Sequence, residues 1–181
     1  MEFAIKNKWV SLGGSSVVQD LQGNDVMKVK GKFFTFTQKK FLTDMDGNLK
    51  FVIRNKFWRL FTYRALIFDP EGKQVAMLRR KIFSFHDRYF VTSDLGDMEI
   101  IGNFLQFNYR IILNGNEIGH VARKISLRDS FVLTADDAYD PSFMVALVIA
   151  VDNITDRKDR DNAAAAGGAG GAAWGSSRSS R

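Results

Sequence analysis

The chain has 181 residues, a size that fits one domain, and 45% of them are hydrophobic, enough to bury a sizeable core. It contains no cysteine, which excludes disulfides, thiolate nucleophiles and cysteine-based zinc sites, and only two histidines, His86 and His120. No apolar run reaches the roughly 20 residues of a spanning helix, and none of signal-peptide length follows Met1. We therefore expect a cytoplasmic protein without a transmembrane segment.

The formal net charge of +6 is unevenly distributed along the chain. Residues 28–64 contain ten lysines and arginines against only Asp44 and Asp46, whereas residues 99–152 contain four basic and seven acidic side chains. The basic first half indicates an anionic partner, such as phosphate headgroups, nucleic acid or an acidic protein surface. The alternative is a set of solvated strand faces without a ligand.

Two kinds of short element alternate along the chain with a period of about 24 residues. The first kind contains two or three basic residues in five of its six copies and ends on an aromatic or aliphatic residue; it occupies residues 6–9, 30–33, 54–57, 79–82, 101–104 and 122–125. The second kind ends in glycine and occupies residues 20–23, 44–47, 69–72 and 93–96, with a looser copy at 114–115. An acidic or hydroxyl residue three before a glycine is typical of a turn, because the side chain caps it and glycine accepts positive φ.

The segments between these elements alternate like strands, with Leu49, Phe51 and Ile53 on one face and Lys50 and Arg54 on the other. Each repeat is therefore predicted to be a β-hairpin, and six hairpins give about twelve antiparallel strands. A sheet of that size is expected to close into a barrel, because closure removes unpaired edges. Side chains of twelve strands alone do not fill such a barrel. The predicted fold class is all-β, and an additional element must occupy the centre.

The end of the chain supplies a candidate for the barrel interior. Nine consecutive apolar residues, 143–151, follow Asp140 and Pro141, an N-cap and first-turn pair that marks a helix start. A helix that is apolar on every side must be buried all round. The β-branched residues of the run favour a final buried strand as the alternative. We predict a domain over 1–154 with a central helix at about 141–154, followed by a disordered low-complexity tail or expression artefact over 155–181.

These features together resemble the LURP-one-related family of the tubby C-terminal-like superfamily. The resemblance rests on the repeated Lys-aromatic elements, the Asp-x-x-Gly turns, the opening residues 3–13 and the closing apolar segment that runs into residues 151–154. It covers residues 1 to about 154 and lies in the order and spacing of the motifs. It implies a twelve-stranded barrel around a C-terminal helix. Tubby domains bind phosphoinositides, and the related scramblases act at membranes.

The basic pairs of four successive repeats form the candidate binding site. Residues two apart share a strand face, so equivalent pairs gather into a basic belt at one level of the barrel, which could hold anionic headgroups. The belt consists of Lys6, Lys8, Lys30, Lys32, Arg54, Lys56, Arg79 and Lys81. The adjacent aromatic residues could insert at a membrane interface. Alternatively, the elements mark strand bends, with Gly31, Asn55 or Gly102 in irregular backbone, snorkelling lysines and aromatic residues packed inside.

The sequence contains no Gly-x-Ser-x-Gly, no Walker loop, no His-Glu-x-x-His and no Rossmann fingerprint following a strand, so the common enzyme motifs are missing. Packing or surface roles are expected for the two histidines, and the cluster of Asp136, Asp137 and Asp140 is expected to complement a helix dipole. We therefore expect no catalytic residues, metal or cofactor. The predicted function is non-enzymatic binding of phospholipid headgroups at the cytosolic membrane surface, with a scaffold for an acidic protein partner as the alternative. No recognition helix or stacking motif supports nucleic-acid binding.

Overall fold

The computed structural model describes residues 1–6, 15–31, 39–56, 62–81, 88–104, 106–123 and 130–168. These residues form twelve β-strands and one α-helix. The strands are β1 (Glu2–Lys6), β2 (Ser15–Asp20), β3 (Asp25–Gly31), β4 (Lys40–Asp44), β5 (Leu49–Lys56), β6 (Thr62–Phe68), β7 (Gln74–Lys81), β8 (Arg88–Ser93), β9 (Gly96–Asn103), β10 (Asn108–Leu113), β11 (Asn116–Arg123) and β12 (Ser130–Ala135), and the helix is α1 (Pro141–Gly168).

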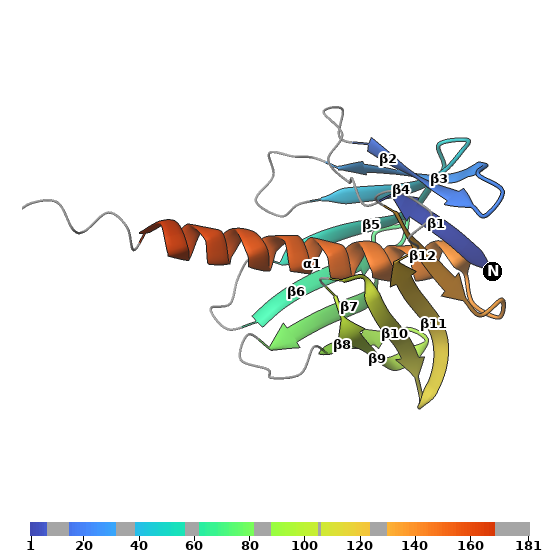
Figure 1. The fold of residues 1–181 in the computed structure, drawn as a ribbon. Coiled ribbons are helices and arrows are strands. Elements are labelled where there is room, and N and C mark those ends of the chain that lie inside the picture. The colour runs from blue at the N-terminus through green and yellow to red at the C-terminus, as the bar shows by residue number, and fades with distance from the viewer. Residues whose placement is uncertain are drawn as a thin grey trace, which may run out of the picture.

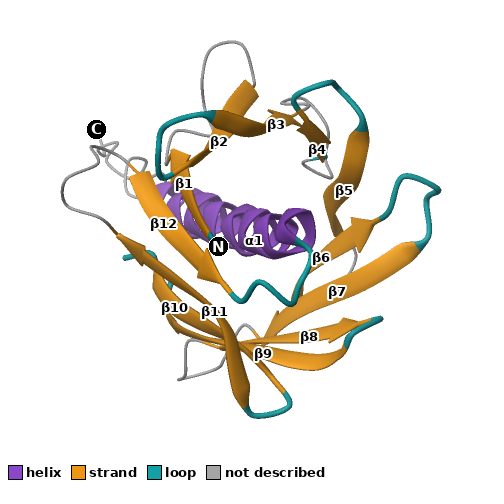
Figure 2. Cartoon of the chain, turned by 90° about the vertical axis from the view of Figure 1, so that its right-hand side faces the viewer, coloured by secondary structure: helices purple, strands orange, loops and turns teal. Residues whose placement is uncertain are grey.

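The strands form one closed antiparallel barrel. Each strand pairs with the next along the chain, and β1 closes the barrel by pairing with β12, from Glu2 opposite Thr134 to Lys6 opposite Ser130. Figure 2 shows the strands surrounding α1, and Figure 1 shows α1 leaving the barrel at the end opposite the N-terminus. The predicted all-β fold with a helix at its centre is thus confirmed. Closure leaves no strand edge open for pairing with another chain.

The predicted glycine turns connect the hairpins at one end of the barrel, which we call the turn end. In the turn from Asp44 to Gly47, the amide of Gly47 donates to the carbonyl of Asp44 at 3.3 Å, and Gly47 has a φ of 92°. The Asp44 carboxylate accepts the backbone amide of Asn48 at 2.8 Å. Asp20 makes the same contact with Asn24. The opposite end of the barrel, where β3 leads to β4 and β5 to β6, is called the loop end.

The central helix begins as its cap predicts. The carboxylate of Asp140 accepts the backbone amide of Ser142 at 2.8 Å, and Pro141 is the first helical residue. Every residue from 143 to 151 is at most 6% exposed, because strands surround this part of the helix. Gly119 on β11 leaves room for the helix, since a Cβ there would lie 2.7 Å from Cε of Met144.

The predicted helix end at about residue 154 is wrong. The helix continues to Gly168, through residues that were expected to form a disordered tail. The segment lacks core-forming residues, but alanine is the strongest helix former and the helix ends at a glycine pair. The composition of this segment therefore excludes burial in the core, but it does not exclude a helix. Residues 169–181 lie outside the described residues. In the part of the chain that the structure describes, no helix is long and apolar enough to cross a membrane.

Candidate functional site

The structure describes four of the eight predicted belt side chains, and they point out of the barrel: Lys30, Arg54, Lys56 and Arg79. Their strand neighbours Val29, Ile53 and Leu78 are buried inside, as strand alternation requires. Lys6 and Lys81 are the last residues of β1 and β7, and only their backbone is described. Lys8 and Lys32 lie outside the described residues.

The strand register relates the belt positions of successive hairpins. Arg54 pairs with Leu66 and Leu66 pairs with Met77, which lies two residues before Arg79, the equivalent of Arg54 in the next repeat. The same step leads from Lys30 to Arg54. Strands in a barrel are tilted relative to its axis. A constant shift of two residues from one hairpin to the next therefore keeps equivalent residues at the same height along the axis. The repeat positions therefore follow the barrel circumference near the loop end.

Pairing across three strands also creates a continuous row of cations. Lys56 on β5 lies opposite Arg64 on β6, and Arg64 lies opposite Arg79 on β7. We call these three residues the cation row. Arg64 is not one of the predicted belt residues, because it lies outside the repeated element. Only the hairpin register, which sets Arg64 between two predicted belt residues, reveals its place.

Aromatic rings lie against one arginine of the row, Arg79, and against the neighbouring belt residue Arg54. The Arg79 guanidinium lies 5.9 Å from the ring centre of Phe90, and that of Arg54 lies 4.4 Å from Phe68. Among the described residues, no carboxylate forms an ion pair with any member of the row. Within the part of the chain that the structure describes, the buried Nε of Arg64 has no hydrogen-bond partner. Like charges directly opposite in a sheet are destabilising, so this arrangement suits an anionic ligand better than the isolated domain.

Two middle residues of the repeated elements, Asn55 and Arg80, are buried inside the barrel. Asn55 donates from Nδ2 to the carbonyl of Asn153 in α1 at 3.0 Å, and the Arg80 guanidinium lies 5.4 Å from the ring centre of Tyr89. Asn55 pairs with Ala65 and Gly31 with Lys40 without a register shift, and neither has a positive φ, so their expected role in irregular backbone is wrong. The expectation holds at Gly102, whose φ is 146°. These inward residues contribute to the interior, whereas the outward residues carry the surface charge.

The interior near the loop end also contains a buried ion pair. Nζ of Lys40 lies 2.9 Å from the carboxylate of Asp152 on α1, and the two side chains are 14% and 7% exposed. The hydroxyl of Tyr89 lies 3.1 Å from that of Thr155. Burial, with smaller contributions from the charge of Asp152 and from Tyr89, raises the pKa of Tyr109 well above its ordinary value. Tyr109 therefore stays neutral in the folded protein, and these polar groups fix the position of α1.

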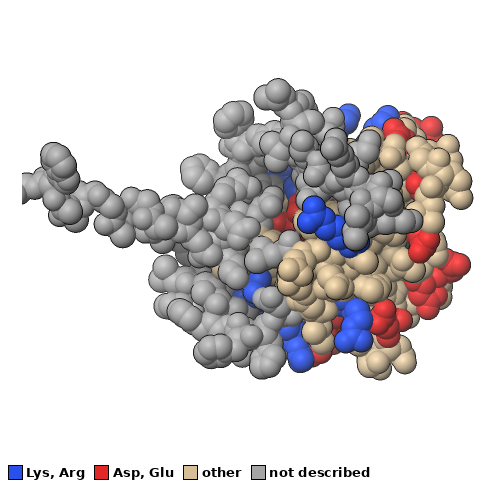
Figure 3. Space-filling view, in the orientation of Figure 1, with Lys and Arg blue, Asp and Glu red and all other residues tan. Residues whose placement is uncertain are grey.

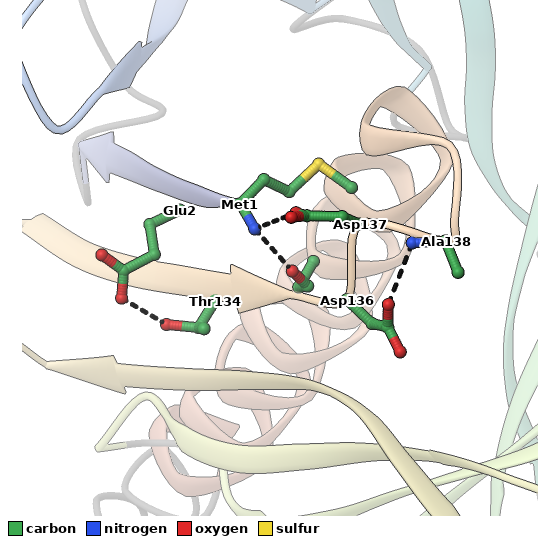
Figure 4. A network of polar contacts seen from close by, with 7 residues as sticks. Met1, Glu2, Thr134, Asp136, Asp137 and Ala138 are labelled. Atoms are coloured by element: carbon green, nitrogen blue, oxygen red, sulfur yellow. Dashed lines mark hydrogen bonds and ion pairs between the residues drawn. The ribbon is translucent and has the colours of Figure 1, made fainter.

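The two histidines and the Asp136, Asp137 and Asp140 cluster make structural contacts where the structure describes them. Nε2 of His120 lies 3.3 Å from Oδ1 of Asn108, and His86 lies outside the described residues. Figure 4 shows that Asp137 pairs with the N-terminal ammonium and that Asp136 accepts the amide of Ala138. Asp140 caps the helix, as predicted. Among the described residues, no three histidine, aspartate or glutamate side chains gather as metal ligands.

Comparison with known proteins identifies the family. The family model described as LURP-one-related matches residues 1–152, which is nearly all of the barrel with its central helix. The chain belongs to the LURP-one-related family. One relative is protein LURP-one-related 15 of Arabidopsis thaliana, 24% identical over 88% of this chain and 82% of that protein. An X-ray structure of a protein from Arabidopsis thaliana has the same fold, with a TM-score of 0.62 and 20% identity over 85% of this chain and 90% of its own.

Proposed function

We propose that this LURP-one-related chain is a non-enzymatic binding module that attaches to anionic phospholipid headgroups at the cytosolic membrane surface. The observation that carries the proposal is the cation row, Lys56, Arg64 and Arg79, on three neighbouring strands. An isolated domain gains nothing from three adjacent like charges, whereas a phosphate-bearing surface neutralises all of them at once. Arginine guanidinium groups suit this role because their planar forks bind phosphate oxygens in a bidentate manner.

The position of the row supports attachment through the loop end. Lys56 is the last residue of β5, and in the sequence it is followed directly by Phe57 and Trp58. Aromatic residues of this kind favour the interface between headgroups and acyl chains. The row therefore lies next to a sequence segment suited to contact with a membrane. An acidic protein surface satisfies the same charges, and the experiment below distinguishes the two ligands.

The test is co-sedimentation with vesicles of phosphatidylcholine alone or mixed with phosphatidylserine or a phosphoinositide, at low and physiological salt. We expect the wild type to bind only the anionic vesicles and to bind them less well as salt rises. The variant Lys56→Glu/Arg79→Glu loses two favourable contributions to the binding free energy of about 1 kcal/mol each. Its affinity for anionic vesicles should therefore fall roughly thirtyfold or more.

The matched control is Lys73→Glu/Arg110→Glu, which changes the net charge equally at two exposed sites outside the row. The control should keep most of its binding, and circular dichroism should show that both variants fold. A wild type that ignores anionic vesicles at low salt contradicts lipid binding and leaves the acidic protein partner. Equal losses in the two variants mean that net charge, and not the row, determines binding.

A further inference from the structure

The turn end of the barrel differs in charge from the belt. The segments 20–24, 44–48, 69–73, 93–96, 113–116 and 135–140 meet there, together with the N-terminus. These segments contain two basic groups, Lys73 and the N-terminal ammonium, and the side chains of Lys28 and Lys50 reach the 44–48 turn from the strands. The nine carboxylates of the segments outnumber them: Asp20, Asp44, Asp46, Asp69, Glu71, Asp94, Asp136, Asp137 and Asp140. Figure 3 shows acidic side chains gathered at this end of the molecule. The turn end therefore attracts cations and repels an anionic membrane.

A pocket opens in this acidic end, where two connecting segments approach each other. One wall is the β8–β9 turn with Asp94 and Leu95, and the other is the link from β12 to α1 with Ala138, Tyr139 and Asp140. Its volume is about 240 Å³, larger than the roughly 150 Å³ cavity that holds a benzene molecule. It thus has room for one large apolar side chain.

The floor of the pocket is apolar and firmly packed. Phe51 from β5 and Phe143 from the first turn of α1 meet edge to face, with ring centres 5.9 Å apart, and Val75 completes the lining. Both phenylalanines belong to the hydrophobic core, at 9% and 6% exposure. Since core residues hold this floor in place, the pocket is formed before any ligand arrives. A ligand therefore needs little rearrangement of the barrel in order to bind.

The rim of the pocket adds an apolar contact and two negative charges. Leu95 is 49% exposed, more than any other large hydrophobic side chain in the described part of the protein. The Asp140 carboxylate uses Oδ1 to cap α1, and the Asp94 carboxylate uses Oδ2 to bind Lys73 at 2.6 Å. Among the described residues, the second oxygen of each carboxylate has no hydrogen-bond partner and can accept from a ligand cation.

From this combination we infer that the turn-end pocket is a docking site for a basic segment of a partner protein. The segment inserts one large aliphatic or aromatic side chain between Leu95 and Tyr139, and its flanking lysines or arginines bind Asp94 and Asp140. The charge selects a basic partner, and the apolar floor selects the inserted side chain. This site is separate from the cation row in position, in charge and in ligand.

The probe for this site is a fluorescein-labelled peptide with one leucine between paired arginines, and fluorescence anisotropy measures its binding. Two control peptides replace the leucine by glycine or the arginines by glutamates. Burial of a leucine side chain corresponds to roughly a tenfold to hundredfold gain in affinity, so the leucine peptide should bind at least ten times more tightly than the glycine peptide. The glutamate peptide should not bind.

Two variants test the pocket itself. Ala138→Phe fills the space, and Asp94→Asn/Asp140→Asn removes both charges while asparagine retains the helix cap. Each should weaken binding of the leucine peptide roughly tenfold or more. The matched control Asp25→Asn/Asp46→Asn changes the net charge equally at exposed sites outside the pocket and should have little effect.

Equal affinity for the leucine and glycine peptides overturns the proposal, as does a control variant that loses as much binding as the pocket variants. Thermal melting followed by circular dichroism shows whether each variant folds. Failure of the peptide to bind leaves lipid binding by the cation row unaffected, since the vesicle experiment uses neither these residues nor this probe.

Discussion

At the scale of single residues, the hairpin turns show how one carboxylate organises a reversal of the chain. Asp44 accepts both the backbone amide and the side-chain amide of Asn48, each at 2.8 Å. These bonds stabilise the charged form of the carboxyl, so the pKa of Asp44 falls to about 2, with the Asn48 side chain as the largest cause. The stability that this ionised group contributes is present above its ordinary pKa of 3.8 and is lost as pH falls toward 2.

Replacing Asn48 by alanine should therefore raise the pKa of Asp44 toward 3.8. Nuclear magnetic resonance titration of the side-chain carboxyl carbon measures this value directly. The control is Asn24→Ala, which removes the equivalent partner of Asp20 in the first turn and should leave the pKa of Asp44 unchanged. If Asn48→Ala does not move the titration of Asp44, the side-chain bond is not the main cause of its low pKa.

Two glycines in the barrel wall are needed for different reasons, and substitution separates them. At Gly102 a Cβ would lie 2.4 Å from the carbonyl oxygen of Asn108, and the φ of 146° disfavours other residues. At Gly119 the nearest obstacle is the flexible tip of Met144. We expect Gly102→Ala to lower the free energy of unfolding by more than about 2 kcal/mol, and Gly119→Ala to lower it by less. Urea denaturation measures both, and the reverse order would contradict this explanation.

At the scale of elements, sequence patterns of a few residues predicted the turns and the helix start, because local hydrogen bonds and backbone conformation determine these features. The aspartate–glycine spacing gave the turns, and Asp140 with Pro141 gave the start of α1. The predicted end of α1 was wrong because residues 155–168 have few side chains that can pack in a core. Helix propensity, and not packing, determines the backbone conformation of this segment. The role of Arg64 and the turn-end pocket were missed because they depend on strand register and on segments far apart in sequence. The spacing of residues in the sequence therefore predicts neither the place of Arg64 nor the pocket.

The buried ion pair between Lys40 and Asp152 joins β4 to the helix and should fix the position of α1 in the barrel. Lys40→Met takes the ammonium group away from the buried Asp152 carboxylate, so we expect it to lower the free energy of unfolding by about 3 to 5 kcal/mol. The double variant Lys40→Met/Asp152→Leu should recover much of that loss, because it removes both charges of the pair. Urea denaturation of both single variants and the double variant completes the cycle. Additive losses would show that the two side chains do not act as a pair.

At the scale of the whole molecule, the barrel separates two chemistries along its axis. The cation row lies toward the loop end, and the carboxylates and the apolar pocket lie at the turn end. The buried part of α1, residues 141–155, is about 22 Å long at 1.5 Å per residue, so the barrel holds the two surfaces well apart. A molecule attached to a membrane by its loop end would present its turn end to the surrounding solution. The proposed functions are therefore compatible and can operate at the same time.

This arrangement predicts the orientation of the vesicle-bound protein. The sequence contains no cysteine, so Met45→Cys at the turn end and Gln106→Cys near the loop end each provide one position for a fluorescent donor, both on exposed residues. With acceptor lipids in anionic vesicles, energy transfer should be clearly stronger from position 106 than from position 45, because attraction acts near the loop end while the turn-end carboxylates are repelled. The variant Lys56→Glu/Arg79→Glu should abolish transfer from both positions. Equal transfer would mean that the barrel lies on its side, and stronger transfer from position 45 would contradict attachment through the cation row.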